Sequence, residues 1–208
     1  MLESLPDEVA EQTISFVDAG GGRKASVPHL SRTSTAGFRA PSGHDVAGTV
    51  RFVGERIGVF GGTFDPPHVG HLVTAVNVRH ALDLDRLLLM VANQPWQKVG
   101  TRSISTAADR LAMVEAAVRG VAGLEASSAE IDRGGDSYTA DTLADLARSH
   151  PGADLFLVLG ADAAAGLPTW ERSDEVRDLA RLVVVDRPGV RGAQVPDGWR
   201  WDHVEVPG

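Results

Sequence analysis

Residues 61–72 read GGTFDPPHVGHL, and this stretch decides the fold of the 208-residue chain. It follows a short apolar run, residues 57–60, and precedes a helical pattern over residues 70–82, so it is predicted to join a strand to a helix. Its first two glycines permit a tight turn and let backbone N–H groups approach a phosphate closely. His68 and His71 fall near the start of the helix, where the positive end of the helix dipole favours an anion. The stretch therefore predicts a phosphate-binding turn.

The histidine pair alone would be weak evidence, because nearby histidines are usually surface or helix-capping residues. No third ligand and no HExxH spacing accompanies the pair, so we predict no metal site built by the protein. The stretch is not a Walker loop, since no GK[ST] follows it, and it is not a GxGxxG fingerprint. The prediction therefore depends on the whole string.

Apolar and helical patterns alternate along the rest of the chain. Strands are predicted at residues 57–60, 86–91, 124–128, 155–159, 182–185 and 203–206. Helices are predicted at residues 70–82, 107–119, 139–148 and 173–180, the last capped by Ser173. Such alternation is typical of an α/β fold with a doubly wound, Rossmann-like parallel sheet and right-handed crossovers. Ligands of these sheets bind beyond the carboxyl ends of the strands, and the informative motifs of this chain all follow strands.

Composition narrows the classes of function. Hydrophobic residues make up 43% and charged residues 23% of the chain, as in an ordinary globular domain. The chain has no cysteine, which excludes a disulfide framework, a thiolate metal site and a cysteine nucleophile. A formal charge of −8 argues against binding nucleic acid through a broad basic face. No apolar run approaches the roughly 18 residues that span a bilayer, and the acidic start does not resemble a signal peptide. We therefore expect no nucleic-acid or membrane partner and a cytoplasmic location.

The first 55 residues differ from the rest, because 20 of them are Gly, Pro, Ser or Thr. Such a segment buries too little apolar surface to offset the entropy lost on ordering. We predict that residues 1–55 are a flexible extension, or precede the true start of translation, and that residues 56–208 form the folded domain.

The string GGTFDPPHVGHL resembles the signature of the HxGH nucleotidylyltransferases, in particular the bacterial nicotinate-nucleotide adenylyltransferases. Further matches follow in that family's order: QPWQK at 94–98, RLAM at 110–113, SYTADTL at 137–143, LGAD at 159–162, PTW at 168–170 and RPG at 187–189. The QPWQK form resembles the actinobacterial branch. The resemblance covers residues 57–206 and implies a sheet of the nucleotidylyltransferase type.

The resemblance implies adenylyl transfer from ATP to nicotinate mononucleotide (NaMN), with Mg²⁺, giving deamido-NAD and pyrophosphate. In that family the acceptor phosphate attacks the α-phosphorus in line, so the protein supplies positioning and charge stabilisation. By the matching motif, His68 and His71 would be the catalytic residues. The ATP- and phosphate-binding positions would be Gly61, Gly62, Thr63, Phe64, Lys98, Gly160 and Asp162.

The resemblance also implies where the acceptor binds. Thr139 matches a position that contacts the nicotinate carboxylate, and Trp170 matches the residue that stacks on the pyridine ring. An indole face suits such an electron-poor ring. Two alternatives stay open: Lys98 could be a solvated loop lysine, and Asp162 could cap the next helix.

Other features receive structural interpretations. Arg110 and Met113 match family positions, and we expect them to support packing and the surface of their helix. Acidic residues in the stretch 174–178 are expected to form a solvated helix face. Trp199 and Trp201 fall in a Gly/Pro-rich loop and give no functional signal.

The chain departs from the family in one respect. The family carries a second phosphate-binding signature, ISSTxxR, whose expected place lies beyond Gly208. The string ISTAADR, residues 104–110, does not replace it, because it lies between the second and third predicted strands and runs into RLAM. We therefore expect a sheet that lacks its C-terminal elements, and weak activity, since lost phosphate donors cost transition-state stabilisation.

The leading hypothesis is an adenylyltransferase acting on NaMN. The alternative from another class is a nucleotide-binding module with little or no turnover. Nicotinamide mononucleotide and pantetheine phosphate are alternative acceptors, although Trp170 and the SYTADTL string argue against pantetheine. A fragment of a class I aminoacyl-tRNA synthetase carries a similar loop, but the acidic charge and the GGTFDPPH string argue against it. Assembly into a homo-oligomer is left open.

Overall fold

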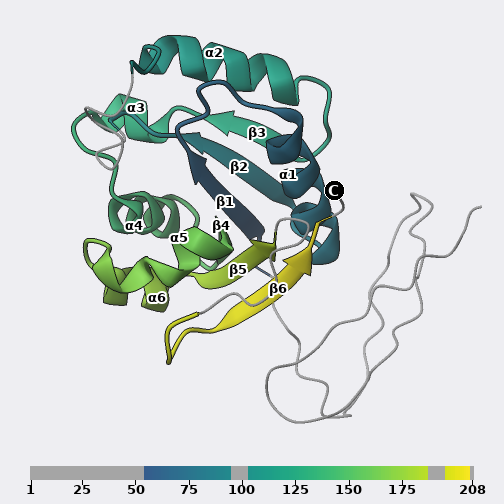
Figure 1. The fold of residues 1–208 in the computed structure, drawn as a ribbon. Coiled ribbons are helices and arrows are strands. Elements are labelled where there is room, and N and C mark those ends of the chain that lie inside the picture. Colours follow the sequence, from purple (N-terminus) through teal and green to yellow (C-terminus); the bar gives the residue numbers. More distant parts are fainter. Residues whose placement is uncertain (1–53, 95–102, 187–194, 207–208) are drawn as a thin grey trace, which may run out of the picture. The chain divides into compact units, whose positions relative to one another are not determined.

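The computed structural model describes residues 54–94, 103–186 and 195–206, all of which belong to the unit Phe52–Gly208. Its strands are β1 (Arg56–Gly62), β2 (Arg86–Val91), β3 (Leu124–Ser127), β4 (Asp154–Gly160), β5 (Arg181–Asp186) and β6 (Trp201–Glu205). They form one sheet in the order β3-β2-β1-β4-β5-β6, and every neighbouring pair is parallel (Figure 1). The predicted α/β fold with a parallel, Rossmann-like sheet is confirmed.

The strand order reverses between β1 and β4. From β1 the chain moves outward through β2 to β3, returns to place β4 beside β1, and then moves outward the other way through β5 to β6. The two central strands are in register with Ile57 opposite Leu155. In parallel sheets of this kind a crevice opens beyond the carboxyl ends at such a switch point. The loops that follow β1 and β4 therefore flank the place where a ligand is expected.

Helices cover both faces of the sheet (Figure 1). On one face lie α1 (Val69–Ala81) and α2 (Ala107–Val118), and on the other lie α4 (Thr139–Ser149), α5 (Ala161–Ala165) and α6 (Ser173–Leu179). Successive residues of β2 alternate between the two cores: Leu87 and Leu89 pack under α1 and α2, whereas Leu88 and Met90 pack under the other helices. Covering both faces explains why the central strands are continuous apolar runs.

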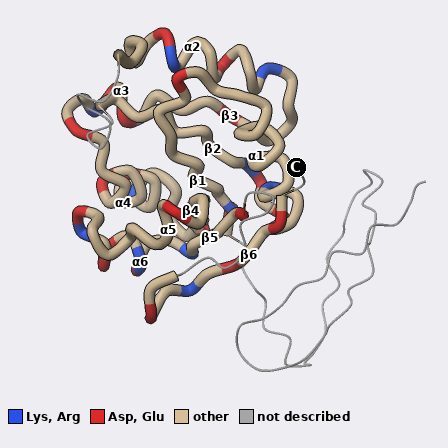
Figure 2. The backbone as a smooth tube through the Cα atoms, in the orientation of Figure 1, with Lys and Arg blue, Asp and Glu red and all other residues tan. Residues whose placement is uncertain are grey.

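Charged residues lie mainly on the helices and at the ends of the strands (Figure 2). At the amino edge of the sheet they contact one another. Arg86 Nη2 lies 3.2 Å from His150 Nε2, Arg86 Nη1 lies 3.5 Å from Glu125 Oε2, and His150 Nδ1 lies 3.4 Å from Glu55 Oε2. Arg56 adds a hydrogen bond of 3.0 Å from Nη2 to the carbonyl of Leu82.

Among the residues that the structure describes, none of the helices has both the length and the apolar character needed to cross a membrane.

The structure corrects three details of the predicted elements. Three short elements were not predicted: α3 (Ala129–Arg133), α5 and the 3-10 turn η2 (Leu167–Thr169). The prediction that Ser173 caps α6 is wrong, because Ser173 is the first helical residue and the N-cap is Arg172, in a left-handed conformation with φ 52°. The last strand begins at Trp201 rather than at residue 203.

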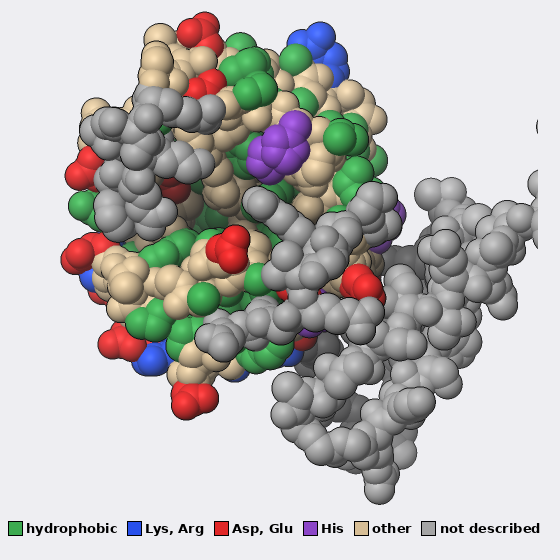
Figure 3. Space-filling model, viewed as in Figure 1, with side chains coloured by type: hydrophobic (Ala, Val, Ile, Leu, Met, Phe, Trp, Pro, Cys, Tyr) green, Lys and Arg blue, Asp and Glu red, His purple; other side chains and the backbone are tan. Residues whose placement is uncertain are grey.

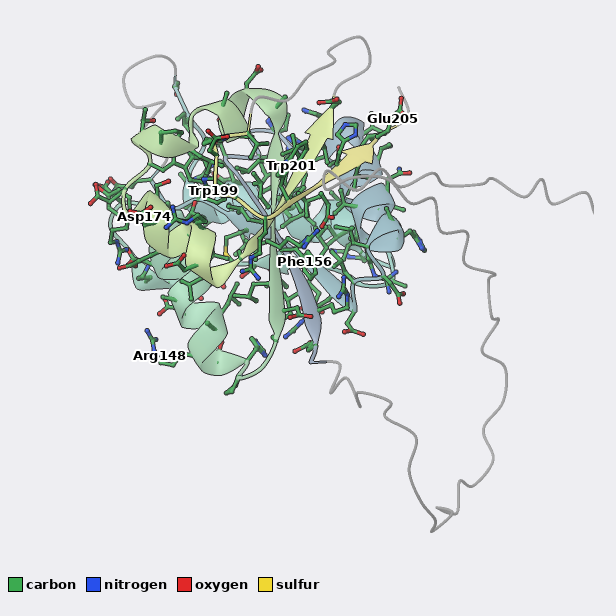
Figure 4. The ribbon with its side chains drawn as sticks, turned by 90° about the horizontal axis from the view of Figure 1, so that it is seen from below. Arg148, Phe156, Asp174, Trp199, Trp201 and Glu205 are labelled. Carbon is green, nitrogen blue, oxygen red and sulfur yellow. The ribbon has the colours of Figure 1, made fainter. Side chains whose placement is uncertain are left out.

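The expected solvated acidic face of α6 is observed, whereas the loop expected to hold both Trp199 and Trp201 ends before Trp201, the first residue of β6. Trp199 and Trp201, labelled in Figure 4, pack against the core under α4, α5 and α6. Asp174, also labelled there, is exposed and pairs with Arg177 of the same helix at 2.8 Å. Neither feature contributes to the wall of the cavity described below.

Candidate active site

A cavity of about 310 Å³ lies at the carboxyl edge of the sheet, at the switch between β1 and β4. Five residues predicted to bind substrate share its wall: Gly61, Gly62, Thr63, Thr139 and Trp170. The rest of the wall is formed by Ala92, Glu130, Ser137, Tyr138, Leu157, Leu159, Ala163 and Glu171. The cavity thus brings together residues of three motifs that lie far apart in the sequence: GGTFDPPHVGHL, SYTADTL and PTW. Its volume is at the lower end of small-molecule sites.

The glycine turn, residues 61–64, begins within β1, because the strand extends two residues beyond its predicted end and includes both glycines. The side chain of Phe64 holds this segment in place. This residue is only 3% exposed and adopts a left-handed conformation with φ 50°, which is strained for an aromatic residue. Its ring lies so close to Gly62 that a Cβ atom there would be 2.8 Å from Phe64 Cζ, whereas a Cβ at Gly61 would meet nothing within 4 Å. Gly62 is therefore required by packing, and Gly61 leaves the surface open to a ligand.

The two histidines of the motif lie at the start of α1. His68 is the N-cap residue, and its ring stacks on that of His71 with centroids 3.7 Å apart. The backbone N–H of His68 donates to His71 Nδ1 at 3.1 Å. An accepting Nδ1 places the proton of a neutral imidazole on Nε2. The ring of Phe64 packs edge-on against His71 at 5.0 Å, so the glycine turn and the histidine pair form one unit.

Figure 3, which has the view of Figure 1, shows histidine side chains at the molecular surface, among hydrophobic and other uncharged groups. His68 is exposed and His71 is half-buried. Neither histidine belongs to the wall of the cavity, but the ring of Phe64 packs against both His71 and Gly62, which does line it. The pair therefore lies at the margin of the cavity, where the helix dipole of α1 also favours an anion.

The opposite wall begins at the N-terminus of α4. Tyr138 is its N-cap residue and makes no side-chain capping hydrogen bond, so the first backbone N–H groups of the helix have no cap from that side chain. Such a helix start attracts a carboxylate or a phosphate. The pKa of the Tyr138 hydroxyl is raised, chiefly by the negative charge of Asp136, which keeps it a neutral donor.

Trp170 is the C-cap residue that follows η2, and it is half-buried in the same wall. Two residues later, Arg172 forms an ion pair with Asp141 in the first turn of α4. This ion pair connects the segment that carries Trp170 to the helix that begins with Thr139. The two residues predicted for the acceptor therefore lie in one wall and are joined by a direct contact between their segments.

Several cavity residues were not singled out from the sequence. Ser137 and Tyr138 belong to the SYTADTL string, so the motif contained them, but only Thr139 was assigned a role. Glu130 is 7% exposed and accepts a hydrogen bond of 2.7 Å from Thr142 Oγ1. It lies on α3, a helix of five residues that is too short to show a helical period. No sequence signal pointed to it.

The other predicted site residues lie outside the cavity wall. Gly160 ends β4, and Asp162 lies exposed in the first turn of α5. Lys98 falls outside the described residues. The structure thus brings together the turn after β1 and the acceptor residues, and it leaves Gly160 and Asp162 at the neighbouring strand end.

Among the described residues there is no group of three or more His, Asp or Glu side chains that could hold a metal ion. The cavity and its surroundings present hydrogen-bond donors, helix N-termini and an aromatic surface. Such an arrangement binds and orients an anionic ligand.

A parallel sheet with a glycine-histidine turn after its central strand, and a cavity at its switch point, defines an α/β protein of the nucleotide-binding kind. The sequence profile of the family described as Cytidylyltransferase-like matches residues 59–205. The chain belongs to this family.

Curated relatives are similar over much of the chain. A protein of Mycolicibacterium vanbaalenii named "Probable nicotinate-nucleotide adenylyltransferase" is 46% identical over 134 residues, which are 64% of this chain and 62% of that protein. A protein of the same name from Saccharopolyspora erythraea is 43% identical over 154 residues, 73% of this chain and 72% of that protein. The match thus spans less than two thirds of the first relative and somewhat more of the second.

A solved structure shares the fold. The nicotinic acid mononucleotide adenylyltransferase of Plasmodium falciparum, complexed with NaAD, superposes with a TM-score of 0.61 over 74% of this chain and 76% of that one. Its sequence identity is 13%, so the likeness concerns the fold.

Proposed function

We propose that this chain transfers the adenylyl group of ATP to nicotinate mononucleotide and forms deamido-NAD and pyrophosphate. The observation that carries the proposal is the shared cavity, in which the glycine turn after β1 faces a wall containing Thr139 and Trp170. The names of the actinobacterial relatives, at 43–46% identity, support the same reaction.

The reaction needs positioning more than it needs a reactive side chain. An oxygen of the NaMN 5′-phosphate forms a bond to the α-phosphorus of ATP, while the bond from that phosphorus to the bridging oxygen of the β-phosphate breaks and pyrophosphate leaves. No covalent intermediate with the protein is formed. Catalysis then consists of alignment of the two reactants and stabilisation of the charge that develops on the transferring group.

The turn after β1 supplies the donors for the phosphates. In this proposal the backbone N–H groups around Gly61, Gly62, Thr63 and Phe64 bind the triphosphate. His68 and His71 donate ring N–H groups to the α-phosphoryl oxygens, where removal of one such donor typically costs about 10²–10³-fold in rate. Lys98 is proposed as a further phosphate contact.

The acceptor is proposed to bind against the opposite wall. Trp170 stacks on the pyridine ring. The uncapped start of α4, with the hydroxyl of Thr139, receives the nicotinate carboxylate, because a helix N-terminus favours a negative charge there. The same contacts discriminate against the amide, which carries no charge. Gly160 and Asp162 are proposed to approach the ribose of the adenosine.

Mg²⁺ enters this proposal as part of the ATP complex. It prefers oxygen ligands and is commonly held by substrate phosphates and water. Since the described residues include no cluster of protein ligands, we assign it no protein ligand. The metal would reduce the negative charge of the phosphates, and the chain would contact those phosphates directly. A cytoplasmic location stays a prediction of the sequence, and assembly into a homo-oligomer stays open.

Pyrophosphate release by the purified chain with Mg-ATP tests the proposal. NaMN, nicotinamide mononucleotide and phosphopantetheine are compared in parallel, and a blank without acceptor corrects for ATP hydrolysis. We expect release with NaMN, matched by an equal amount of deamido-NAD on chromatography, and much less with the other acceptors. Binding of ATP and NaMN without release would contradict adenylyl transfer by this chain. Faster release with another acceptor would contradict its assigned specificity.

A further inference from the structure

Arg110 on α2 is a buried cation with no role in the proposed chemistry. It is 1% exposed, and its guanidinium donates to four backbone carbonyls. Nε donates to Ser105 (3.0 Å), Nη1 to Thr63 (2.9 Å) and Ala92 (2.6 Å), and Nη2 to Asn93 (2.9 Å). Burial in this setting lowers the pKa of Arg110, while the charge of Asp65 opposes that shift.

The four carbonyls belong to three separate segments of the chain. Thr63 lies in the turn after β1, Ala92 and Asn93 follow β2, and Ser105 precedes α2. A buried charge is tolerated only when its donors are satisfied, so each of these segments must keep its carbonyl aimed at the guanidinium. Arg110 therefore ties the phosphate turn to the end of the neighbouring strand.

The carbonyls that Arg110 holds also fix the direction of backbone donors. A trans peptide group is planar, so its N–H points opposite to its carbonyl. The carbonyl of Ala92 faces Arg110, and the N–H of the same peptide, on Asn93, donates to Ser137 Oγ at 2.9 Å. By the same geometry, the carbonyl of Thr63 faces Arg110 and directs the N–H of Phe64 away from the buried side chain.

The turn that Arg110 holds is strained. Phe64 has a left-handed backbone, and such a conformation persists in a bulky residue only where its surroundings determine it. The next residue, Asp65, accepts a hydrogen bond of 3.1 Å from the backbone N–H of Ser105, whose carbonyl Arg110 also holds. Two contacts with the start of α2 thus fix the residues on either side of Phe64.

We propose that Arg110 is a positioning residue for both walls of the cavity. It orients the phosphate-binding turn through Thr63, and it orients the Ser137 hydroxyl of the acceptor wall through the peptide between Ala92 and Asn93. The inference rests on the proposed function for its effect on catalysis. Lysine cannot replace Arg110, because its ammonium is a point charge and lacks the planar fork that reaches separate carbonyls.

Three variants of the full chain test the proposal: Arg110→Lys, Arg110→Gln and the control Arg56→Lys. Arg56 also donates to a backbone carbonyl, that of Leu82, but it lies at the amino edge of the sheet. Rates are measured at least ten degrees below the unfolding midpoint of each variant. We expect Arg110→Lys to lower kcat about 10²-fold, since a misplacement near 1 Å can cost that much. Arg56→Lys should keep kcat within about threefold of the parent, as expected of surface positions away from the site.

A second readout does not depend on activity. In ¹⁵N-labelled protein, Arg110→Lys should shift the amide resonances of Phe64, Asn93 and Ser137, and Arg56→Lys should leave them in place. Unshifted resonances in a folded Arg110→Lys variant, or an unchanged kcat, would overturn the proposal. If the parent chain releases no pyrophosphate with NaMN, the proposed reaction fails, and the resonances alone decide for or against Arg110.

If neither Arg110 variant folds, Ser137→Ala provides the deciding test. This variant removes the side chain that Asn93 binds and leaves Arg110 in place. In the proposal the Ser137 hydroxyl accepts from the N–H of Asn93 and donates its own proton to NaMN. We therefore expect a shifted Asn93 amide and a NaMN affinity weakened about tenfold, the effect of one hydrogen bond at a charged ligand. An unchanged affinity would overturn the link from Arg110 to the acceptor wall.

Discussion

At the amino edge of the sheet charged side chains bind one another, whereas the carboxyl edge holds a cavity lined by the two glycines, Thr139 and Trp170. Arg86 at the amino edge contacts Glu125 and His150, and His150 contacts Glu55. At the carboxyl edge the buried guanidinium of Arg110 binds only backbone carbonyls among the contacts that the structure describes. At the amino edge charged side chains thus pair with one another, whereas at the carboxyl edge a buried cation orients backbone peptide groups.

This difference follows from the direction of the chain in a parallel α/β fold. Each helix begins near the carboxyl edge and ends near the amino edge, so the positive ends of the helix dipoles gather where the cavity lies. At the other edge the last turns carry Arg79, His80 and Arg148, which suit the negative ends of α1 and α4. Substitutions at the carboxyl edge should therefore change function, and those at the amino edge should change stability.

The largest effect is expected from the histidines. We expect His68→Ala and His71→Ala each to lower the maximal rate of pyrophosphate release about 10²–10³-fold, because each removes a donor that we propose for the transferring phosphoryl group. His150→Ala is the matched control at the amino edge and should leave the rate unchanged. A His71→Ala variant with more than a third of the parent rate would remove the histidines from the chemistry.

Trp170→Ala should have the next largest effect. Loss of the stacking surface is expected to raise the KM for NaMN about tenfold, in line with about 1–3 kcal/mol for stacking of a base on an aromatic side chain. The KM for ATP serves as an internal control and should stay within a factor of two of the parent, roughly the scatter expected for uncoupled sites. Trp170→Phe should recover part of the loss. An equal rise in both KM values would indicate general damage to the fold.

At the amino edge, Arg86→Met should lower the stability of the fold and leave the transfer rate unchanged. The variant loses the ion pairs with Glu55 and Glu125 and the contact with His150. We expect the free energy of unfolding to fall by about 1 kcal/mol. For a domain of this size that lowers the unfolding midpoint by roughly 2–4 °C. Thermal denaturation gives the midpoint, and the transfer rate at 20 °C, roughly room temperature, should match the parent. A large loss of rate in a folded variant would show that the two edges are not independent.

The smallest effect concerns Asp145 of α4. Its pKa is lowered by hydrogen bonds from Arg148 and then Arg133, so its ionised form is favoured in the folded state. Asp145→Asn should cost less than about 1 kcal/mol at neutral pH, because the carboxylate is largely solvated. Since the folded pKa lies below the unfolded one, this contribution is lost as the pH falls below the ordinary value of about 3.9. Urea unfolding of the parent and of Asp145→Asn at pH 7 and about pH 3 tests this prediction. The same difference in unfolding free energy at both pH values would contradict a stabilising role of the Asp145 carboxylate.

The long central elements could be predicted because their patterns are strong. The strand Arg86–Val91 is observed with the predicted bounds, since a buried parallel strand is a continuous apolar run. The short helices α3 and α5 could not be predicted, because five residues do not show a helical period. The start of β6 was misplaced by two residues, in a region where a Gly/Pro-rich loop hides the alternation.

The residues of the site also divide into those that the sequence could predict and those that it could not. Gly62, Thr139 and Trp170 could be chosen from motifs, and their meeting in one cavity follows from the rule that strand ends of a parallel sheet share an edge. Arg110 was expected to support packing, and its burial agrees with that. Its bridging of three segments could not be predicted, because its partners are backbone carbonyls and any residue type supplies those.

Amide hydrogen exchange, measured by mass spectrometry with and without deamido-NAD, tests most directly whether the carboxyl edge is the binding edge. Slower exchange is predicted in peptides covering residues 61–71, 137–142 and 165–171, which hold the turn, the start of α4 and the Trp170 segment. Peptides covering residues 54–57, 84–87 and 150–154, at the amino edge, should exchange at unchanged rates. Protection at the amino edge, or no protection anywhere at saturating ligand, would contradict the assignment of function to the carboxyl edge.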